Sequence, residues 1–251
     1  MNPAPPDAFR YSPGFYDYIE QGARRAADRL LPILHASLAP AGVLDVGCGR
    51  GIWLDTWIRL GVQDVLGLDG AYVDPARLAI PSASFRSLDV SQPFELGRRW
   101  SLAQCLEVGE HIPTARSATL VQNLTRHADH ILFSAAEPGQ GGHNHINEQP
   151  LEFWRQLFGQ HGYQAYDVVR PVLHDDRMVE PWYRYNTLLY VRDSAAAALP
   201  GAVSRLRLDA ARPIPRFAPW SWQFRRLLLR PLPVGLVTAL GRLKNRLKGS
   251  S

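Results

Sequence analysis

The sequence predicts an α/β protein with a doubly wound, mainly parallel sheet that carries helices on both faces. Two observations predict this class. Short apolar segments alternate with helical segments, and the connections between them are short. With 46% hydrophobic and 20% charged residues, the 251-residue chain has the composition of a globular protein with room for one such domain and an appendage.

The predicted elements follow one another along most of the chain. Residues 15–37 are predicted to be helical, because apolar side chains recur there every three or four positions. The other predicted elements are strands at 43–46, 64–68, 84–88, 102–106, 131–134, 166–169 and 187–191, and helices at 51–60, from about 114 onward and at 151–161. The last two strands lack a helix of usual length between them, which predicts an antiparallel hairpin at the end of the sheet.

Charge divides the chain after residue 193. Residues 194–251 contain eleven Lys and Arg residues and one Asp, so they carry +10, while residues 1–193 carry −5. Prolines between Pro213 and Pro233 interrupt regular structure there. We therefore expect a domain at 1–193 and a basic, Pro-interrupted tail at 194–251. The acidic domain argues against nucleic acid as a partner, because nucleic-acid binding depends largely on neutralising phosphates.

The sequence also predicts a cytoplasmic location. The first ten residues lack the basic-then-apolar order of a signal peptide. No uncharged apolar run approaches the roughly 18 residues that span a bilayer. The two cysteines, Cys48 and Cys105, both lie in apolar segments. They do not form a disulfide framework, which suits a reducing compartment.

A glycine-rich turn joins the first predicted strand to the helix after it. Gly47, Gly49 and Gly51 let the backbone turn sharply and let a ligand approach closely. A dinucleotide-binding turn has the spacing G-x-G-x-x-G and holds an anionic pyrophosphate. Here the spacing is G-x-G-x-G and Asp45 precedes it, which disfavours an anion and tolerates a cation. We expect Asp45 and the three glycines to contact a cationic cofactor.

Two further carboxylates end predicted strands. Asp69 lies at the end of the second strand, where it can accept both hydroxyls of a ribose. Asp89 closes the third strand, where it can accept an adenine amino group while Leu88 or Val90 packs against the ring. A solvated turn aspartate is an equal alternative for Asp89.

The cofactor-binding pattern resembles a known family. The run VLDVGCGRGIWL, followed by VLGLD, resembles motif I and the next acidic motif of class I S-adenosylmethionine (SAM)-dependent methyltransferases, and the resemblance spans residues 15–192. The segments CLEVGEHIP, FSAAEPGQGGHNHINEQPLEFW and PWYRYNTLLYV resemble a bacterial branch of mostly uncharacterised members, associated with glycan or natural-product modification. The resemblance implies SAM as donor and a Rossmann-like sheet of seven strands with the last strand antiparallel.

The candidate catalytic residues follow the fourth predicted strand. Its end faces the crevice where ligands bind in open α/β sheets. Methyl transfer to a hydroxyl requires alignment and removal of a proton, so we assign catalytic roles to Glu110 and His111, with His111 as general base. The alternative is that both residues cap the helix near Pro113 and hydrogen-bond locally.

A metal site is a sharper interpretation of the same segment. Glu107-x-x-Glu110-His111 with a later histidine resembles the metal-binding pattern of ubiquinone-biosynthesis O-methyltransferases and small-RNA 3′-terminal methyltransferases. The resemblance implies that Glu107, Glu110, His111 and His145 hold a divalent cation, magnesium or manganese, against acceptor hydroxyls. We favour His145 over His143. The glycine at position 109 and the His-Asn-His spacing depart from the pattern, and a site with two histidines equally suits iron or zinc.

The acceptor and the tail leave alternatives open. Residues 140–148 and 182–186 offer aromatic and amide groups that suit a sugar or a flat ring, although Trp182 and Tyr185 alternatively pack the last strand. Residues 234–248 form, as a helix, a leucine stripe with basic shoulders, which suits a membrane surface or equally a protein partner.

Three hypotheses for the function follow. The first is SAM-dependent O-methylation of a sugar, glycan or other small hydroxylated acceptor, with the tail as a candidate contact to the inner membrane surface. The second is an RNA 2′-O-methyltransferase, which shares the Glu/Glu/His/His pattern. The third is a SAM-binding protein without catalysis that is tethered through its tail.

Overall fold

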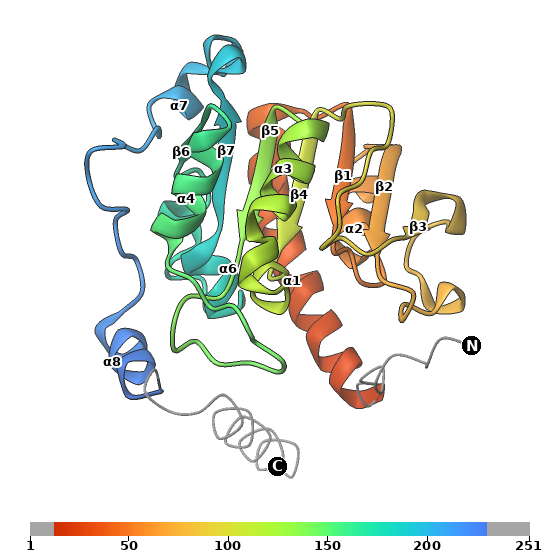
Figure 1. Cartoon of the computed structure of the whole chain (residues 1–251), viewed down its shortest axis with the longest axis horizontal. Helices are drawn as coiled ribbons and strands as arrows, with labels where there is room; N and C mark the ends of the chain where they lie inside the picture. Colours follow the sequence, from red (N-terminus) through yellow and green to blue (C-terminus); the bar gives the residue numbers. More distant parts are fainter. Residues whose placement is uncertain (1–12, 230–251) are drawn as a thin grey trace.

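The computed structural model describes residues 13–229, with side chains from Glu20 onward. Its centre is a seven-stranded sheet in the order β3-β2-β1-β4-β5-β7-β6 (Figure 1). The strands are β1 (Gly42–Val46), β2 (Asp64–Asp69), β3 (Phe85–Ser87), β4 (Leu102–Leu106), β5 (His130–Ser134), β6 (Tyr163–Tyr166) and β7 (Leu188–Arg192). Strands β1 to β5 are parallel, and β7 is antiparallel to both β5 and β6. The predicted fold class and the antiparallel last strand are confirmed.

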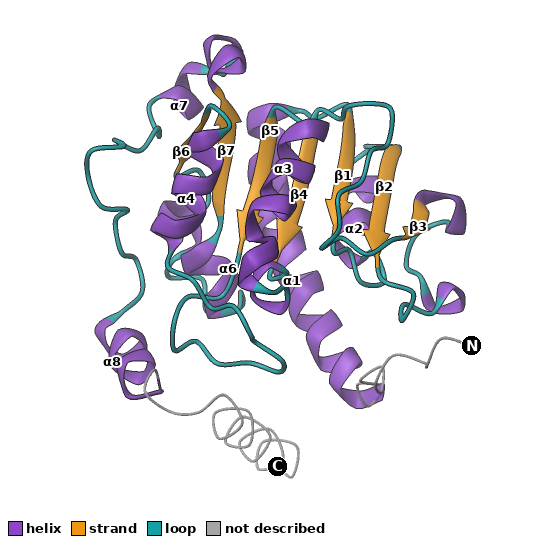
Figure 2. Ribbon diagram, in the orientation of Figure 1, coloured by secondary structure: helices purple, strands orange, loops and turns teal. Residues whose placement is uncertain are grey.

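Helices cover both faces of the sheet (Figure 2). The helices α1 (Pro13–Leu38) and α2 (Ile52–Arg59) pack on one face, and α3 (Ser117–His127) and α4 (Leu151–Gln160) pack on the other. Four further helices follow: α5 (Arg170–Leu173), α6 (Pro181–Asn186), α7 (Gly201–Ser204) and α8 (Trp220–Leu229). This layering gives the chain two apolar cores, one on each side of the sheet.

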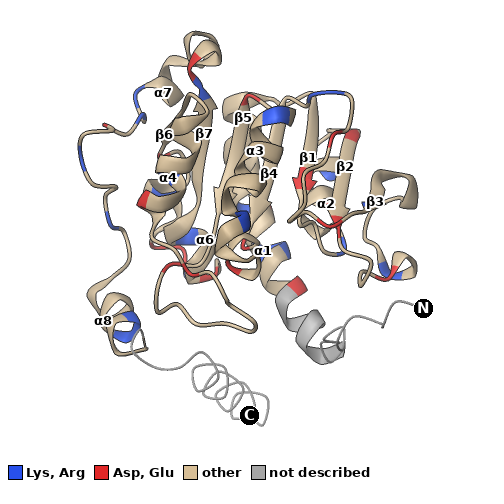
Figure 3. Cartoon of the chain, viewed as in Figure 1, with Lys and Arg blue, Asp and Glu red and all other residues tan. Residues whose placement is uncertain are grey.

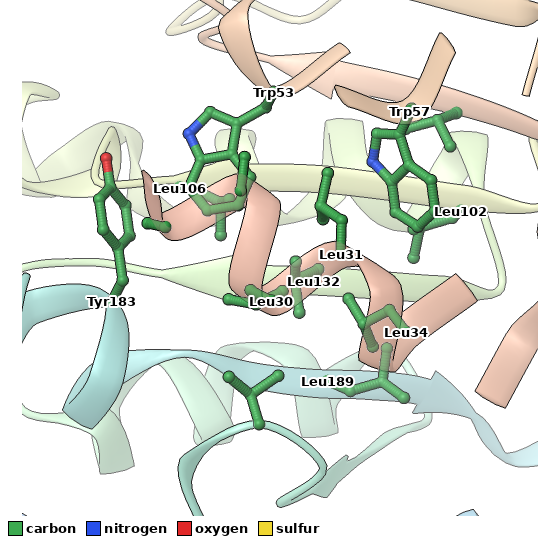
Figure 4. Close-up of a cluster of buried hydrophobic side chains, with 14 of the residues drawn as sticks. Leu30, Leu31, Leu34, Trp53, Trp57, Leu102, Leu106, Leu132, Tyr183 and Leu189 are labelled. Atoms are coloured by element: carbon green, nitrogen blue, oxygen red, sulfur yellow. The ribbon is translucent and has the colours of Figure 1, made fainter. Parts of the chain in front are cut away.

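The core under α1 fixes the helices next to the cofactor turn. Leu30, Leu31 and Leu34 recur on one face of α1 and are fully buried, as the apolar periodicity of this helix predicts (Figure 4). They belong to the same cluster as Trp53 and Trp57 of α2. Because α2 begins directly after the glycine turn, this packing holds the turn at the carboxyl end of β1.

The sixth strand lies earlier than the sequence predicts. The prediction placed it at 166–169, whereas β6 spans Tyr163–Tyr166 and pairs with β7 from Tyr163 opposite Arg192. The error arises at the turn after α4, where Gly162 has φ +73° and lets the chain enter the strand at once. Residues 167–169 instead lead into α5. The segment between β6 and β7 holds α5 and α6, so the two strands pair antiparallel without a tight turn.

The described part of the tail packs against the domain. Leu199 and Val203 join the core under α1, and Ile214 joins the opposite core. The segment from Leu199 to Ile214 therefore contributes to both cores, and the division at residue 193 stays a prediction. The amphipathic helix predicted at 234–248 lies outside the described residues. Within residues 13–229, no helix combines the length and the apolar character that crossing a membrane requires.

Candidate active site

The glycine turn has a backbone that only glycine adopts readily. Gly47, Gly49 and Gly51 have φ of +83°, +54° and +82°. A Cβ on Gly47 would lie 2.3 Å from Cγ2 of Val108, so the turn is also tightly packed against the segment after β4. At Gly49 the space around a Cβ is open, and its N–H donates to Asp69 Oδ2 at 2.6 Å. The turn and the end of β2 are thereby joined.

Asp69 lies at the carboxyl end of β2, beside the glycine turn, because β1 and β2 pair in register up to Val46 and Leu68. It is 4% exposed. Its carboxylate accepts hydrogen bonds from the N–H groups of Gly49 and Gly70 and from the hydroxyl of Tyr72. The sequence argument did not identify Tyr72, which follows Asp69 by three residues with no pattern of its own.

Asp45 is a buried carboxylate on the strand that enters the turn. It is 2% exposed, and its Oδ2 has no hydrogen-bond partner among the described residues. Burial raises the pKa of Asp45 to about 7; Gln104 opposes this rise, and the charge of Asp69 adds to it. A carboxylate with an unpartnered oxygen beside a glycine turn suits a positively charged ligand.

Asp89 and Val90 lie farther from the turn. Strand β3 ends at Ser87, so Asp89 is in the loop beyond it and is exposed. Its Oδ1 accepts hydrogen bonds from the N–H and the hydroxyl of Ser91, at 3.0 and 2.6 Å. Val90 is half-buried against the apolar core. The structure thus gives Asp89 the local turn contact that was the alternative to an adenine contact.

The second cluster of acidic and imidazole groups follows β4, at the edge where the parallel strands end and acidic residues gather (Figure 3). Ligand atoms of Glu110, His111 and His145 all lie within 4.8 Å of one another. The predicted fourth member, Glu107, lies beside this group but outside it. Gly109, which departs from the family pattern, is required by packing, since a Cβ there would lie 2.7 Å from the ring of Trp154.

Glu110 is the most deeply buried group of the cluster, at 1% exposure. Neither of its carboxylate oxygens has a hydrogen-bond partner within the described part of the chain. Burial, with the nearby charge of Glu107, raises the pKa of Glu110 well above its usual value. The carbonyl oxygen of Glu110 accepts from the N–H groups of Ile146 and Asn147 at 2.9 and 3.0 Å. These bonds bring the loop that carries His145 to the end of β4.

The two histidines are oriented by oxygen acceptors. Nδ1 of His111 lies 3.2 Å from the carbonyl oxygen of Asn144, which can only accept, so this nitrogen carries the proton. Nδ1 of His145 lies 2.9 Å from Oε1 of Glu148, and the two rings meet edge to face at 5.1 Å. Burial, followed by the neighbouring His145, lowers the pKa of His111 to about 4. The ring of His111 is therefore neutral near pH 7.

Glu107 is positioned by residues that the sequence argument assigned to the acceptor. Glu107 has φ +56°, and its Oε2 accepts from Nε2 of Gln140 at 3.0 Å. Nδ2 of Asn186 in turn donates to Oε1 of Gln140 at 2.8 Å. Gln140, Asn186 and Tyr185 are all buried. They therefore lie in the interior and are not open to an acceptor, while Gln140, held by Asn186, orients Glu107. Their roles depend on contacts between distant segments and have no local sequence signal.

The chain matches known proteins over its sheet. A family model described as a methyltransferase domain matches residues 18–168, more than half of the chain. The ubiquinone biosynthesis O-methyltransferase of Acinetobacter baylyi is 34% identical over 131 residues, which are 49% of this chain and 50% of that protein. The protein of that name from Proteus mirabilis is 32% identical over 100 residues, 37% and 40% of the two chains. This chain thus spans about half the length of the curated relatives it matches.

Two solved structures have a similar fold. The sugar N-methyltransferase KedS8 from a Streptoalloteichus species superposes with a TM-score of 0.57 at 17% identity, covering 76% of this chain and 97% of that chain. DesVI of Streptomyces venezuelae superposes with a TM-score of 0.55 at 15% identity, covering 73% and 100%. Together, the family match, the sheet order and the glycine turn with its acidic partners show that this chain belongs to the methyltransferase-domain family and has the Rossmann-like fold of class I SAM-dependent methyltransferases.

Proposed function

We propose that the chain transfers the methyl group of SAM to a hydroxyl of a small acceptor such as a sugar or glycan. The observation that carries this proposal is the buried carboxylate of Glu110, which has no hydrogen-bond partner among the described residues and lies beside His111 and His145, at the edge of the sheet that also holds the glycine turn. The curated relatives named as ubiquinone biosynthesis O-methyltransferases support a hydroxyl acceptor, and the sugar N-methyltransferase with a similar fold is compatible with a sugar.

Residues around the turn would hold SAM. Asp69 would accept the ribose hydroxyls, and Asp45 would face the positively charged methionine end. Bound SAM supplies a methyl group that is already electrophilic, so the chain contributes alignment of the acceptor and removal of a proton. For Asp89 and Val90 we retain the proposed adenine contact, through Oδ2 of Asp89 and the half-buried side chain of Val90.

The second cluster fits a divalent cation, which we propose as a cofactor. A carboxylate buried without partners among the described residues is costly unless a positive charge faces it, and the imidazoles of His111 and His145 lie next to it. Oε1 of Glu107 is also buried, has no hydrogen-bond partner in the part of the chain that the structure describes, and would provide a fourth ligand. Two nitrogen ligands suit manganese, iron or zinc at least as well as magnesium. When bound, such a cation would orient an acceptor hydroxyl and lower its pKa.

His111 has the geometry of either a ligand or a general base. Its protonated Nδ1 faces the carbonyl of Asn144, which leaves Nε2 able to bind a cation or to accept a proton. The pKa of about 4 makes the ring a weak base at neutral pH. We therefore propose that His111 and Glu110 act on the acceptor mainly by holding the cation that activates its hydroxyl.

Manganese binding tests the metal assignment independently of turnover. Free Mn²⁺ is titrated with the protein and followed by electron paramagnetic resonance, because bound Mn²⁺ loses the sharp signal of the aqueous ion. We expect one site in the wild-type chain, and loss of that site in Glu110→Gln and His145→Ala. His130→Ala is the matched control, since His130 contacts Ser101 far from the cluster. Equal binding by Glu110→Gln would place the cation elsewhere.

Turnover tests the reaction. Labelled SAM is offered with hydroxylated sugars, catechol-type phenols and a short RNA, with and without EDTA. We expect transfer to a small hydroxyl acceptor, loss of transfer in EDTA and recovery with Mn²⁺. Transfer to RNA alone would favour a nucleic-acid methyltransferase. Full activity of Glu110→Gln and His111→Ala would remove both residues from the mechanism.

We also propose that the tail contacts an anionic membrane surface from the cytoplasmic side. Its described helix, α8, exposes Trp220, Phe224, Leu227 and Leu228 on one face, and residues 194–251 carry +10. Truncation after Leu229 leaves the packed residues Leu199, Val203 and Ile214 in place. We expect truncation to reduce pelleting with phosphatidylglycerol vesicles, and Trp220→Ser/Phe224→Ser to reduce it further. Undiminished pelleting of both variants would exclude this role.

A further inference from the structure

The helix α8 lies beyond residue 168, where the family match ends, and it contacts the loop that carries His145. Nη1 of Arg226 lies 2.5 Å from Oε2 of Glu137, and both side chains are less than one-fifth exposed. Nε of Arg226 donates to the carbonyl oxygen of Pro138 at 3.2 Å. A Cβ on Gly139 would lie 2.2 Å from the carbonyl oxygen of Arg226, so the two backbones touch. The turn at 137–140 is thus the surface on which α8 rests.

From this turn, one chain of contacts leads to Glu107. Nη1 of Arg225 donates to the carbonyl oxygen of Gln140 at 3.3 Å. The side chain of Gln140 bridges Asn186 and Glu107. The residue that α8 holds by its backbone is therefore the residue whose amide orients the Glu107 carboxylate.

A second chain of contacts leads to His145. The carboxylate of Glu148 accepts the N–H groups of Gly139 and Gly141 at 2.8 and 2.7 Å. The same carboxylate lies 2.9 Å from Nδ1 of His145. The backbone of the turn under α8 and the ring of His145 thus share one acceptor.

The contact between α8 and the turn depends on a few specific groups. No residue of α8 is buried, and a recess of about 420 Å³ remains between the helix and the loop, lined in part by Glu137, Pro150, Trp220 and Phe224. Because α8 buries no apolar side chain against the loop, its position depends on Arg225, Arg226 and the close backbone approach at Gly139. Substitutions at these groups are therefore expected to release α8 without unfolding the sheet.

We propose that α8 is a positioning element of the active site, which holds the 137–148 loop so that Glu107 and His145 face the acceptor. The proposal rests on the proposed function for its effect on turnover. It assigns to the tail a task in catalysis that is separate from any contact with a membrane. Groups that orient the residues around a metal or an acceptor typically affect affinity or activity by roughly 10- to 100-fold.

Gly139→Ala is the direct test, and Gly97→Ala is its matched control. Both glycines have positive φ, +81° and +70°, so alanine adds similar backbone strain at each. Only at Gly139 does the new methyl group meet α8; at Gly97 the space is open. Hydrogen exchange is followed by mass spectrometry in peptides that cover 137–148 and 220–229 of the full-length protein.

We expect Gly139→Ala to raise exchange in both peptides, to weaken Mn²⁺ binding and to lower kcat by roughly 10- to 100-fold, with the SAM Kd unchanged. Gly97→Ala should change none of these. Faster exchange in 220–229 alone, with the loop and Mn²⁺ binding as in the wild type, would overturn the proposal. Because exchange does not require turnover, this result differs from a failure of the proposed reaction.

Exchanging the charges of Arg226 and Glu137 tests whether a variant acts by releasing α8 from the loop or by destabilising the fold in general. Arg226→Glu should behave like Gly139→Ala, because it places a carboxylate against Glu137. Glu137→Arg combined with Arg226→Glu restores opposite charges and should recover protection in the loop and most of kcat. No recovery in the double variant, with both single variants impaired, would contradict a role for this ion pair in docking.

Discussion

The hydroxyl of Tyr72 donates a hydrogen bond to the carboxylate of Asp69, the group that we assign to the cofactor ribose. A phenol hydroxyl thus makes the contact that a ribose hydroxyl would make. The ring of Tyr72 also lies against Gly70, where a Cβ would approach its Cε1 to 2.3 Å. If Asp69 binds the ribose as we propose, the cofactor hydroxyls would displace or share this hydrogen bond, and the Tyr72 hydroxyl would compete with SAM for the carboxylate.

Tyr72→Phe should tighten SAM binding. The variant keeps the ring and removes the competing donor, and one such hydrogen bond contributes about 1 kcal/mol, or roughly fivefold in Kd. Isothermal titration with SAM measures the change. A weaker affinity in Tyr72→Phe would show instead that the hydroxyl contacts the cofactor.

Asp69→Asn should weaken SAM binding far more than Asp89→Asn. Asp69 is 4% exposed and joined to the glycine turn, whereas Asp89 is exposed and bonded to Ser91. Loss of a charge-assisted contact with ribose is expected to cost about 2 kcal/mol, or roughly 30-fold in Kd. Titration calorimetry of both variants, with thermal melts to confirm folding, checks this. Equal losses of SAM affinity in the two variants would show that Asp89 contributes as much to cofactor binding as Asp69.

Asp45 should make both stability and SAM affinity depend on pH. Its pKa is about 7 in the folded chain and near 3.8 when unfolded, so the folded state keeps the proton longer. The contribution of Asp45 to the free energy of unfolding is therefore complete below pH 3.8. It declines as the pH rises to 7, by at most about 4 kcal/mol. The ionised carboxylate of Asp45 attracts the cationic cofactor, so SAM affinity should rise as the pH increases toward 7 and Asp45 loses its proton.

Urea unfolding of Asp45→Asn and the wild-type chain at pH 5 and pH 8 isolates this effect. The variant should gain stability relative to the wild type as the pH rises, because asparagine carries no ionisable proton. Its SAM affinity should be lower and nearly constant with pH. A stability difference that stays the same at both pH values would show that the pKa of Asp45 is not raised.

The sheet could be predicted from the sequence because its signals are local. The apolar run at 43–46, the glycine turn and the carboxylate at Asp69 each follow a short pattern tied to one strand. The error at β6 came from a local ambiguity, since the turn at Gly162 is two residues long and Tyr166 belongs to both the predicted and the observed strand.

The support of the active site could not be predicted in the same way. Gln140, Asn186 and Arg225 lie on three separate segments, and their hydrogen bonds exist only once the loop, α6 and α8 meet. The predicted cluster drew on a family pattern for Glu110, His111 and His145, which the structure brings together. The protonation state of His111 could not be predicted either, because its low pKa depends on burial and on neighbours that only the fold brings close.

Arg170 offers a stability test away from the site. Its guanidinium is 1% exposed and binds both carboxylate oxygens of Asp167, at 2.9 and 2.6 Å, and the carbonyl of Pro215 in the tail. Arg170→Met should cost about 3–5 kcal/mol, because it leaves the buried Asp167 carboxylate unpaired.

Two further variants test whether the cost of Arg170→Met comes from a buried unpaired charge or from the loss of any ion pair. Asp167→Leu added to Arg170→Met should recover most of the loss, since no buried charge is then left without a partner. Arg98→Met breaks the ion pair with Asp64, in which each side chain is about half exposed, and should cost at most about 1 kcal/mol. Urea unfolding of the four proteins at pH 7 measures the differences. Similar costs for Arg170→Met and Arg98→Met would mean that water reaches the Arg170 pair, so that the tail near Pro215 does not seal it.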